Sequence, residues 1–188
     1  YRKGKQVSSF DLRKYSALQG SHNHQNVCAA YAAVRTLGVG PNSVKKALAS
    51  FNGLSHRSQL VAEIGGVVFI NDSKATNVDS AMKALKTFSQ VRWICGGQQK
   101  EEDISRLNNV ISNVKKAYII GSDTTKFSSQ ISCELEICNT MERAVKAAFE
   151  DAIDGETILL APAAASFDQY SSFEERGEDF VNEIKNLI

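Results

Sequence analysis

The stretch that decides the fold runs Val67-Val-Phe-Ile-Asn-Asp-Ser-Lys-Ala-Thr-Asn77. Its first four residues are apolar, as in a strand that is buried on both faces. The polar residues that follow end in Asn77, a residue type that caps helices well, so we expect a helix to begin near Val78. The stretch therefore predicts a strand, a short loop and a helix, which together open a strand–helix–strand unit.

Short apolar strands and helical segments continue to alternate along the rest of the chain. Because two parallel strands need a crossover of roughly a dozen residues, this alternation predicts an α/β fold with a mostly parallel sheet flanked by helices. The glycine pair Gly65-Gly66 instead predicts a tight antiparallel hairpin between the first two strands. The expected strands are 60–64, 67–70, 91–95, 117–120, 135–137 and 157–161, and the expected helices are 78–88, 102–112, 124–130, 140–153 and 174–187.

The segment that precedes this alternation differs from it in charge. Residues 1–52 hold eight Lys or Arg against the single acidic residue Asp11, whereas residues 53–188 hold fourteen against twenty. The change falls at Asn52-Gly53, a turn dipeptide, and predicts a boundary between two domains. The cations are scattered over some fifty positions without a recognisable nucleic-acid-binding module, so no nucleic-acid partner is expected.

Two helices are expected in this basic segment. Residues 26–37 carry Val27, Ala30, Tyr31, Val34 and Leu37 at three- and four-residue steps, the pattern of an amphipathic helix. Pro41 can start a second helix. Its expected buried stripe consists of Val44, Ala47, Leu48 and Phe51.

Membrane and metal sites receive little support. No apolar run approaches the roughly 18 to 20 residues of a membrane span, and the first thirty residues lack the zones of a signal peptide, so we expect a cytoplasmic protein without a membrane partner. The four cysteines show no metal-ligand spacing, and the pair His22 and His24 has no acidic or cysteine partner nearby. We therefore predict no metal ligand in this chain.

Candidate binding residues follow the ends of three expected strands, where ligands bind in open α/β sheets. The segment 71–77 mixes an acid, a cation and hydroxyls and suits a phosphate or a carboxylate. The segment 96–100 offers two glycines and Lys100, although such a glycine pair is more often a plain turn. The segment 162–168 is rich in small residues and contains Ser166. His56 and Arg57 follow the predicted boundary, where side chains of one domain can meet a ligand held by another.

Six motifs can be read along the chain: His22-Asn23-x-x-Asn26, Phe51-x-Gly53-Leu54-x-His56-Arg57, Asn71-Asp-Ser-Lys-Ala-Thr-Asn77, Gly96-Gly97-x-x-Lys100, Ala161-Pro-Ala-x-Ala-Ser166-Phe-Asp168 and Phe173-Glu-x-Arg176-Gly177. Taken together, they resemble the Mur ligase family over residues 18 to about 180. The first motif is common to Mur and folylpolyglutamate ligases, whereas the segment 71–77 is close to diagnostic for the members that add glutamate. Gln98-Gln99 and Phe167 depart mildly from the family pattern.

The resemblance implies a domain organisation. Residues 1–52 would be the end of a central ATP-binding domain, and residues 53–188 a C-terminal Rossmann-like domain that binds the incoming amino acid. The phosphate loop and the Mg²⁺ ligands would lie in a part that this chain lacks. The chain alone is therefore expected to form no amide bond.

The resemblance also implies an activity and a set of site residues. Members of this branch use ATP and Mg²⁺ to join D-glutamate to UDP-N-acetylmuramoyl-L-alanine through an acyl phosphate, a step of peptidoglycan precursor synthesis. Catalytic roles fall on His56, Arg57 and Lys74, nucleotide contacts on Asn23, Asn26, Arg57 and Asp72, and the D-glutamate pocket on Thr76, Lys100, Ser166 and Phe173. Two alternatives stay open: a nucleotide- or amino-acid-binding module without catalysis, and another ligase of the Mur or folylpolyglutamate type, against which the segment 71–77 argues.

Overall fold

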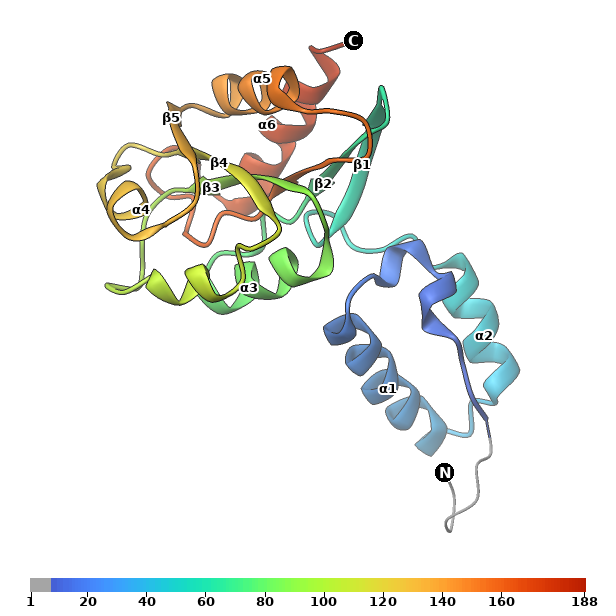
Figure 1. Ribbon diagram of the computed structural model, residues 1–188. Coiled ribbons are helices and arrows are strands. Elements are labelled where there is room, and N and C mark those ends of the chain that lie inside the picture. Colours follow the sequence, from blue (N-terminus) through green and yellow to red (C-terminus); the bar gives the residue numbers. More distant parts are fainter. Residues whose placement is uncertain (1–7) are drawn as a thin grey trace. The chain divides into compact units, whose positions relative to one another are not determined.

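A computed structural model describes residues 8–188, and in it the chain divides into two units, one ending at Gly53 and the other running from Leu54 to Ile188 (Figure 1). Arg2, Lys3 and Lys5, which belong to the basic segment, lie outside the described residues. Each unit is described below by itself.

The first unit is helical. Two short 3₁₀ turns, Leu12–Lys14 and Ser16–Leu18, precede helix α1 (Ser21–Thr36) and helix α2 (Pro41–Ser50). Both helices were predicted, although α1 begins five residues earlier than expected. The predicted buried stripe of α2 is wrong, because no residue of α1 or α2 is buried. Between residues 8 and 53, two helices and two turns supply no sheet or third layer against which the apolar side chains could pack.

The second unit is built on a six-stranded sheet with the order β1-β2-β6-β3-β4-β5. Strands β1 and β2 pair antiparallel, and all other neighbours pair parallel. The mostly parallel sheet and the antiparallel hairpin at Gly65-Gly66 are therefore confirmed. The strands are β1 (Gln59–Ile64), β2 (Val67–Asn71), β3 (Val91–Gly96), β4 (Val114–Ile120), β5 (Leu135–Asn139) and β6 (Thr157–Leu160).

Helices cover both faces of this sheet (Figure 1). One face packs against α3 (Val78–Thr87), the 3₁₀ helix η3 (Ser105–Asn109) and α4 (Thr125–Gln130), in an apolar cluster around Trp93. The other face packs against α5 (Met141–Asp151) and α6 (Phe173–Lys185), in a cluster that includes Phe69 and Phe180. Strands that feed both clusters must be apolar on both faces, as their sequences are.

The helix expected over residues 102–112 is wrong. Only the five-residue 3₁₀ helix η3 forms there, with Ile104 and Leu107 buried one turn apart. Side-chain hydrogen bonds replace the missing helical ones, because Ile104 N donates to Gln130 Oε1 at 2.8 Å and Asn108 Nδ2 donates to the Gln130 carbonyl at 2.8 Å. The segment is held by α4 rather than by its own helical ladder.

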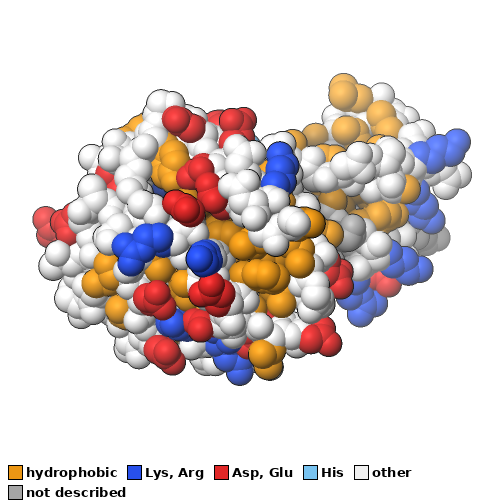
Figure 2. Space-filling model, turned by 90° about the horizontal axis from the view of Figure 1, so that it is seen from above, with side chains coloured by type: hydrophobic (Ala, Val, Ile, Leu, Met, Phe, Trp, Pro, Cys, Tyr) orange, Lys and Arg blue, Asp and Glu red, His pale blue; other side chains and the backbone are white. Residues whose placement is uncertain are grey.

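Charge is distributed differently over the two units. Figure 2 shows Lys and Arg side chains gathered on the first unit, whereas acidic and basic side chains mix over the second. Within residues 8–188, no helix has both the length and the apolar character needed to cross a membrane.

Candidate functional site

The loops that follow β2, β3 and β6 meet at the carboxyl edge of the parallel sheet. Ala163 N donates to the Ala75 carbonyl at 2.9 Å, which joins the β6 loop to the β2 loop. Gln98 and Ala165 exchange two backbone hydrogen bonds of 2.9 Å, which join the β3 loop to the β6 loop. Three of the polar segments that the sequence singled out thus form one continuous surface.

The first turn of α6 closes this surface on one side. The ammonium nitrogen of Lys74 lies 3.9 Å from the centre of the Phe173 ring, within range of a cation–π contact. One residue earlier, Ser73 Oγ donates to the Phe173 carbonyl at 2.7 Å. Lys74 and Phe173, predicted to act on neighbouring parts of the reaction, are therefore in contact.

Thr76, Lys100 and Ser166 lie on these same loops. Ser166 is buried and Thr76 half-buried, whereas Lys100 is exposed and takes part in no ion pair among residues 8–188. Beside Lys100, the amide group of Gln99 is buried, and neither its oxygen nor its nitrogen has a hydrogen-bond partner. Such an orphaned amide is costly unless something binds it, so it marks this loop as a candidate ligand contact.

His56 is held by a buried hydrogen-bond network around Asn71. Asn71 Oδ1 accepts from Ser73 N at 3.1 Å, and Asn71 Nδ2 donates to the Gly177 carbonyl at 2.9 Å. These two bonds fix which end of the amide carries the hydrogens, so the 3.1 Å contact from Nδ2 to His56 Nδ1 requires Nδ1 to accept. Only Nε2 of His56 remains for a further hydrogen bond.

Close packing keeps His56 in place. A Cβ on Gly177 would lie 2.2 Å from His56 Nδ1, so only glycine fits beneath the ring. The His56 backbone has a φ of 61°, and its carbonyl accepts from Lys74 N at 3.1 Å. The loop that carries His56 and the exposed Arg57 is thereby attached to the β2 loop.

Asp72 is the site carboxylate whose titration the structure alters most. Burial raises the pKa of Asp72 to about 6, while a hydrogen bond from Ser58 N at 3.2 Å and the charge of Arg57 act in the opposite direction. The cause is loss of water around the charged form, which favours the protonated acid.

This shift predicts a pH-dependent contribution to stability. Because the folded protein binds the Asp72 proton more tightly than the unfolded chain, the free energy of unfolding falls as the pH rises from about 4 to about 6. Asp72→Asn removes this loss and keeps an oxygen for Ser58 N. We expect the variant to gain about 1 to 3 kcal/mol relative to wild type between pH 4 and pH 7, measured by urea unfolding across that range. A constant difference between the two proteins would contradict the assignment.

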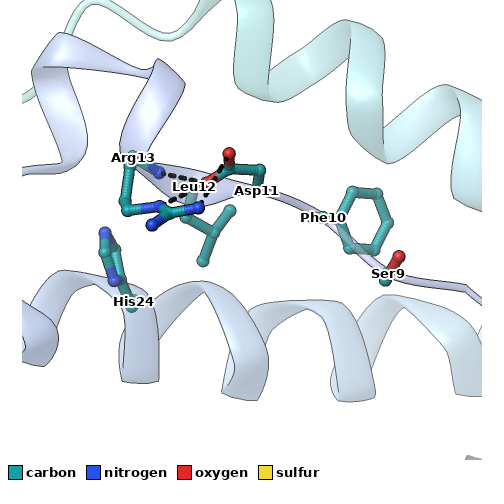
Figure 3. A pocket seen from close by; sticks show the side chains of 6 residues that line it. All are labelled: Ser9, Phe10, Asp11, Leu12, Arg13 and His24. Carbon is teal, nitrogen blue, oxygen red and sulfur yellow. Dashed lines mark hydrogen bonds and ion pairs between the residues drawn. The ribbon is translucent and has the colours of Figure 1, made fainter.

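Asn23 and Asn26 lie in the first unit, one turn apart on α1. Asn23 Nδ2 donates to the Gln19 carbonyl at 2.8 Å, and Asn26 is exposed. Near them a surface hollow contains an ion pair of Arg13 and Asp11, 2.9 Å apart, which lowers the pKa of Asp11 (Figure 3). The hollow is lined by Ser9, Phe10, Asp11, Leu12, Arg13 and His24.

A known family matches the part of the chain that carries the loops after β2 and β3. The family described as "Mur ligase, glutamate ligase domain" matches residues 56–164, which contain the loops after β2 and β3 and the first four residues of the loop after β6. The chain belongs to the Mur ligase family. The match begins at His56 and ends two residues before Ser166.

Curated Mur ligases resemble the whole chain. A protein of Ruegeria pomeroyi is 56% identical over 188 residues, and one of Cereibacter sphaeroides (strain ATCC 17029 / ATH 2.4.9) is 58% identical over 189; both alignments include all of this chain. Both relatives are named UDP-N-acetylmuramoylalanine--D-glutamate ligase. The chain spans only 40% and 41% of their lengths.

Solved structures agree on the fold. A MurF ligase from Thermotoga maritima in complex with ADP matches 90% of this chain and 40% of its own, with a TM-score of 0.66 and 17% identity. FolC of E. coli in complex with DHPP and ADP matches the same shares, with a TM-score of 0.59 and 22% identity. These likenesses confirm the α/β fold expected of a Mur ligase C-terminal domain.

Three residues of the site were not assigned a role from the sequence. Asn71, Gln99 and Arg176 stood inside or next to the quoted motifs, but nothing in a linear pattern shows that they are buried. Arg176 is 1% exposed and Asn71 0% exposed, so both are buried as deeply as the site residue Ser166.

Proposed function

We propose that this chain is part of an ATP-dependent ligase that joins D-glutamate to UDP-N-acetylmuramoyl-L-alanine. The observation that carries the proposal is the meeting of Lys74, Thr76, Lys100, Ser166 and Phe173 on loops joined by hydrogen bonds at one edge of the sheet. The names of the relatives that match the whole chain support the same substrate pair.

The pocket that we assign to D-glutamate suits its two carboxylates. Lys100 forms no ion pair with the part of the chain that the structure describes, and it lies on the loop next to the segment of Ser166. Lys100 and Thr76 would bind one carboxylate, and Ser166 with backbone N–H groups near Phe173 would bind the other. Charge-assisted hydrogen bonds of this kind are roughly twice as strong as neutral ones.

We assign Arg57 and Asp72 to the nucleotide, together with Asn23 and Asn26 of the first unit. ATP supplies the phosphoryl group that activates the substrate carboxylate as an acyl phosphate, which the amine of D-glutamate then attacks with release of phosphate. Lys74 and Arg57 would stabilise the negative charge that develops in both steps. His56, whose Nδ1 is occupied by Asn71, would act by positioning the loop of Arg57.

The remaining parts of the enzyme are assigned by the same reasoning. Within residues 8–188, no group of three or more His, Cys, Asp or Glu side chains could hold a metal ion, so we propose that the Mg²⁺ accompanying ATP is bound by another part of the ligase. We assign residues 1–52 to the end of the ATP-binding domain and 53–188 to the domain that binds the amino acid. The complete ligase would then act in the cytoplasm, in peptidoglycan synthesis.

Replacing Lys100 tests the D-glutamate pocket. In the complete ligase, Lys100→Ala is expected to lower kcat/KM for D-glutamate about 10- to 150-fold, because one charge-assisted contact of roughly 1.5 to 3 kcal/mol is lost. Steady-state kinetics with D-glutamate and ATP varied in turn would measure the effect. The effect of Ser166→Ala should be smaller, since water can replace one hydroxyl.

The exposed lysine Lys115 of β4 provides the matched control, because Lys115→Ala removes the same charge away from the site loops. It should leave both KM values within two-fold of wild type. If Lys100→Ala instead raised KM for ATP and left KM for D-glutamate unchanged, the pocket would have to be reassigned to the nucleotide. A wild-type enzyme that used a folate substrate and not UDP-N-acetylmuramoyl-L-alanine would favour the folylpolyglutamate alternative.

A further inference from the structure

Arg176 is a buried cation that no anion contacts. Its side chain lies in the first turns of α6 and is 1% exposed, and no ion pair among residues 8–188 includes it. All its hydrogen bonds go to neutral oxygens: Nε to Ser73 Oγ at 3.1 Å, Nη2 to the Ser73 carbonyl at 2.9 Å, and Nη1 to the Ala164 carbonyl at 3.1 Å. Burial lowers the pKa of Arg176 to about 10, and the charge of Asp168 nearby offsets this only in part. Burying a charge that no carboxylate pairs with directly is costly, so a role for that charge is expected.

The guanidinium bonds two of the loops that carry the proposed D-glutamate pocket and lies beside the third. Ser73 precedes Lys74 on the β2 loop. Its hydroxyl accepts from Arg176 and donates to the Phe173 carbonyl, so it links the guanidinium to the start of α6. Ala164 lies two residues before Ser166 on the β6 loop. The β3 loop passes close by as well, since a Cβ on Gly97 would lie 3.2 Å from Nη1.

This arrangement fits the binding of an anionic ligand better than it fits simple filling of space in the core. An apolar side chain could fill the same space without the cost of burying a charge. A planar fork with five donors can hold several carbonyls in fixed geometry, and its charge is felt by anions nearby because the interior screens it weakly. A substrate with two carboxylates would bring further negative charge toward a guanidinium whose own hydrogen-bond partners are neutral oxygens.

We propose that Arg176 is a positioning residue for the acidic amino-acid substrate: it fixes the loops after β2, β3 and β6 in the binding geometry and places a positive charge beneath the pocket. This inference rests on the proposed function. Arg176 acts through the residues that it holds in place and through the electric field of its charge. It does not contact the reacting atoms.

Two substitutions in the complete ligase separate geometry from charge. Arg176→Gln removes the charge and two of the three arms of the fork, and is expected to raise KM for D-glutamate 10- to 100-fold while KM for ATP stays within about two-fold. Arg176→Lys keeps the charge and should recover part of the loss. Arg143→Gln, at an exposed arginine of α5, is the matched control and should change neither constant.

Ser73→Ala covers the case in which Arg176→Gln does not fold. It removes the hydroxyl between Arg176 and Phe173 but keeps the Ser73 carbonyl, and should raise KM for D-glutamate two- to ten-fold. Unchanged KM for D-glutamate in folded Arg176→Gln, or in Ser73→Ala when Arg176→Gln is unfolded, would overturn the proposal. An equal rise of both KM values would also overturn it, since that indicates a general structural role. Wild-type enzyme that forms no amide with D-glutamate would overturn the proposed function itself, and this inference with it.

Discussion

Gly96→Ala is expected to lower the free energy of unfolding of the second unit by about 3 kcal/mol or more. Gly96 ends β3 with a φ of 116°, and a Cβ there would lie 2.0 Å from the backbone oxygen of Ile120 on β4. A strained backbone conformation costs of order 1 to 3 kcal/mol, and overpacking a tight contact adds a similar amount. Urea unfolding followed by tryptophan fluorescence would report the change, since Trp93 lies in the same strand.

Gly155 supplies the matched control for this prediction. Its φ is 84°, so alanine is strained there as well, but nothing lies within 4 Å of the Cβ that would be added. Gly155→Ala should therefore cost only about 1 kcal/mol, the backbone contribution alone. Equal losses in the two variants would contradict the close approach of β3 to β4 at Gly96.

The end of β3 at Gly96 is bonded to a loop of the candidate site. Gly96 N donates to the Pro162 carbonyl at 2.9 Å, so displacement of the end of β3 would also displace the β6 loop. Lys100 follows on the same chain segment. We expect the alanine variant to lose affinity for D-glutamate, the substrate that we propose, in the part of the population that remains folded.

The sheet could be predicted from sequence because its signals are local. Strands β2, β3 and β6 are mostly apolar runs. Helices α3, α5 and α6 begin at side-chain caps, as at Asn77, whose side chain accepts from Ser80 N at 2.8 Å. The glycine pair between β1 and β2 likewise determines its hairpin from adjacent residues. Local signals of this kind do not depend on what the rest of the chain does.

The expectations that failed depended on tertiary partners. The segment 102–112 has helical spacing, yet Gln130 supplies hydrogen bonds that stabilise a 3₁₀ helix instead. The apolar stripe of α2 predicts burial, but residues 8–53 of the first unit form no layer that covers it. Helix propensity does not decide the local structure where a distant side chain satisfies the backbone hydrogen-bonding groups in another geometry.

The same reason explains which site residues sequence reasoning missed. Arg176 contacts Ser73 across 103 positions, and Asn71 contacts Gly177 across 106. No window along the chain contains both members of either pair. Loop residues such as Thr76 and Lys100 could be proposed because they follow strand ends, whereas the buried residues that hold those loops together required the folded structure.

Asn71→Asp is the second change for which a large effect is expected. The introduced carboxylate can still accept from Ser73 N, but it cannot donate to the Gly177 carbonyl or to His56 Nδ1, the two groups that the amide nitrogen serves. Each buried group left without its partner costs roughly 1 to 3 kcal/mol. We therefore expect a loss of about 2 to 5 kcal/mol in the free energy of unfolding at pH 7, measured by urea denaturation.

The control for this change is chemically identical and lies six residues away. Asn77→Asp places a carboxylate at the exposed cap of α3, where it still accepts from Ser80 N and faces the positive end of the helix, so its effect should stay within about 0.5 kcal/mol. The Asn71→Asp loss should also shrink as the pH falls, because burial favours the protonated acid, which can donate again. A pH-independent loss, or equal losses at both positions, would show that Asn71 does not hold His56 by donating to it.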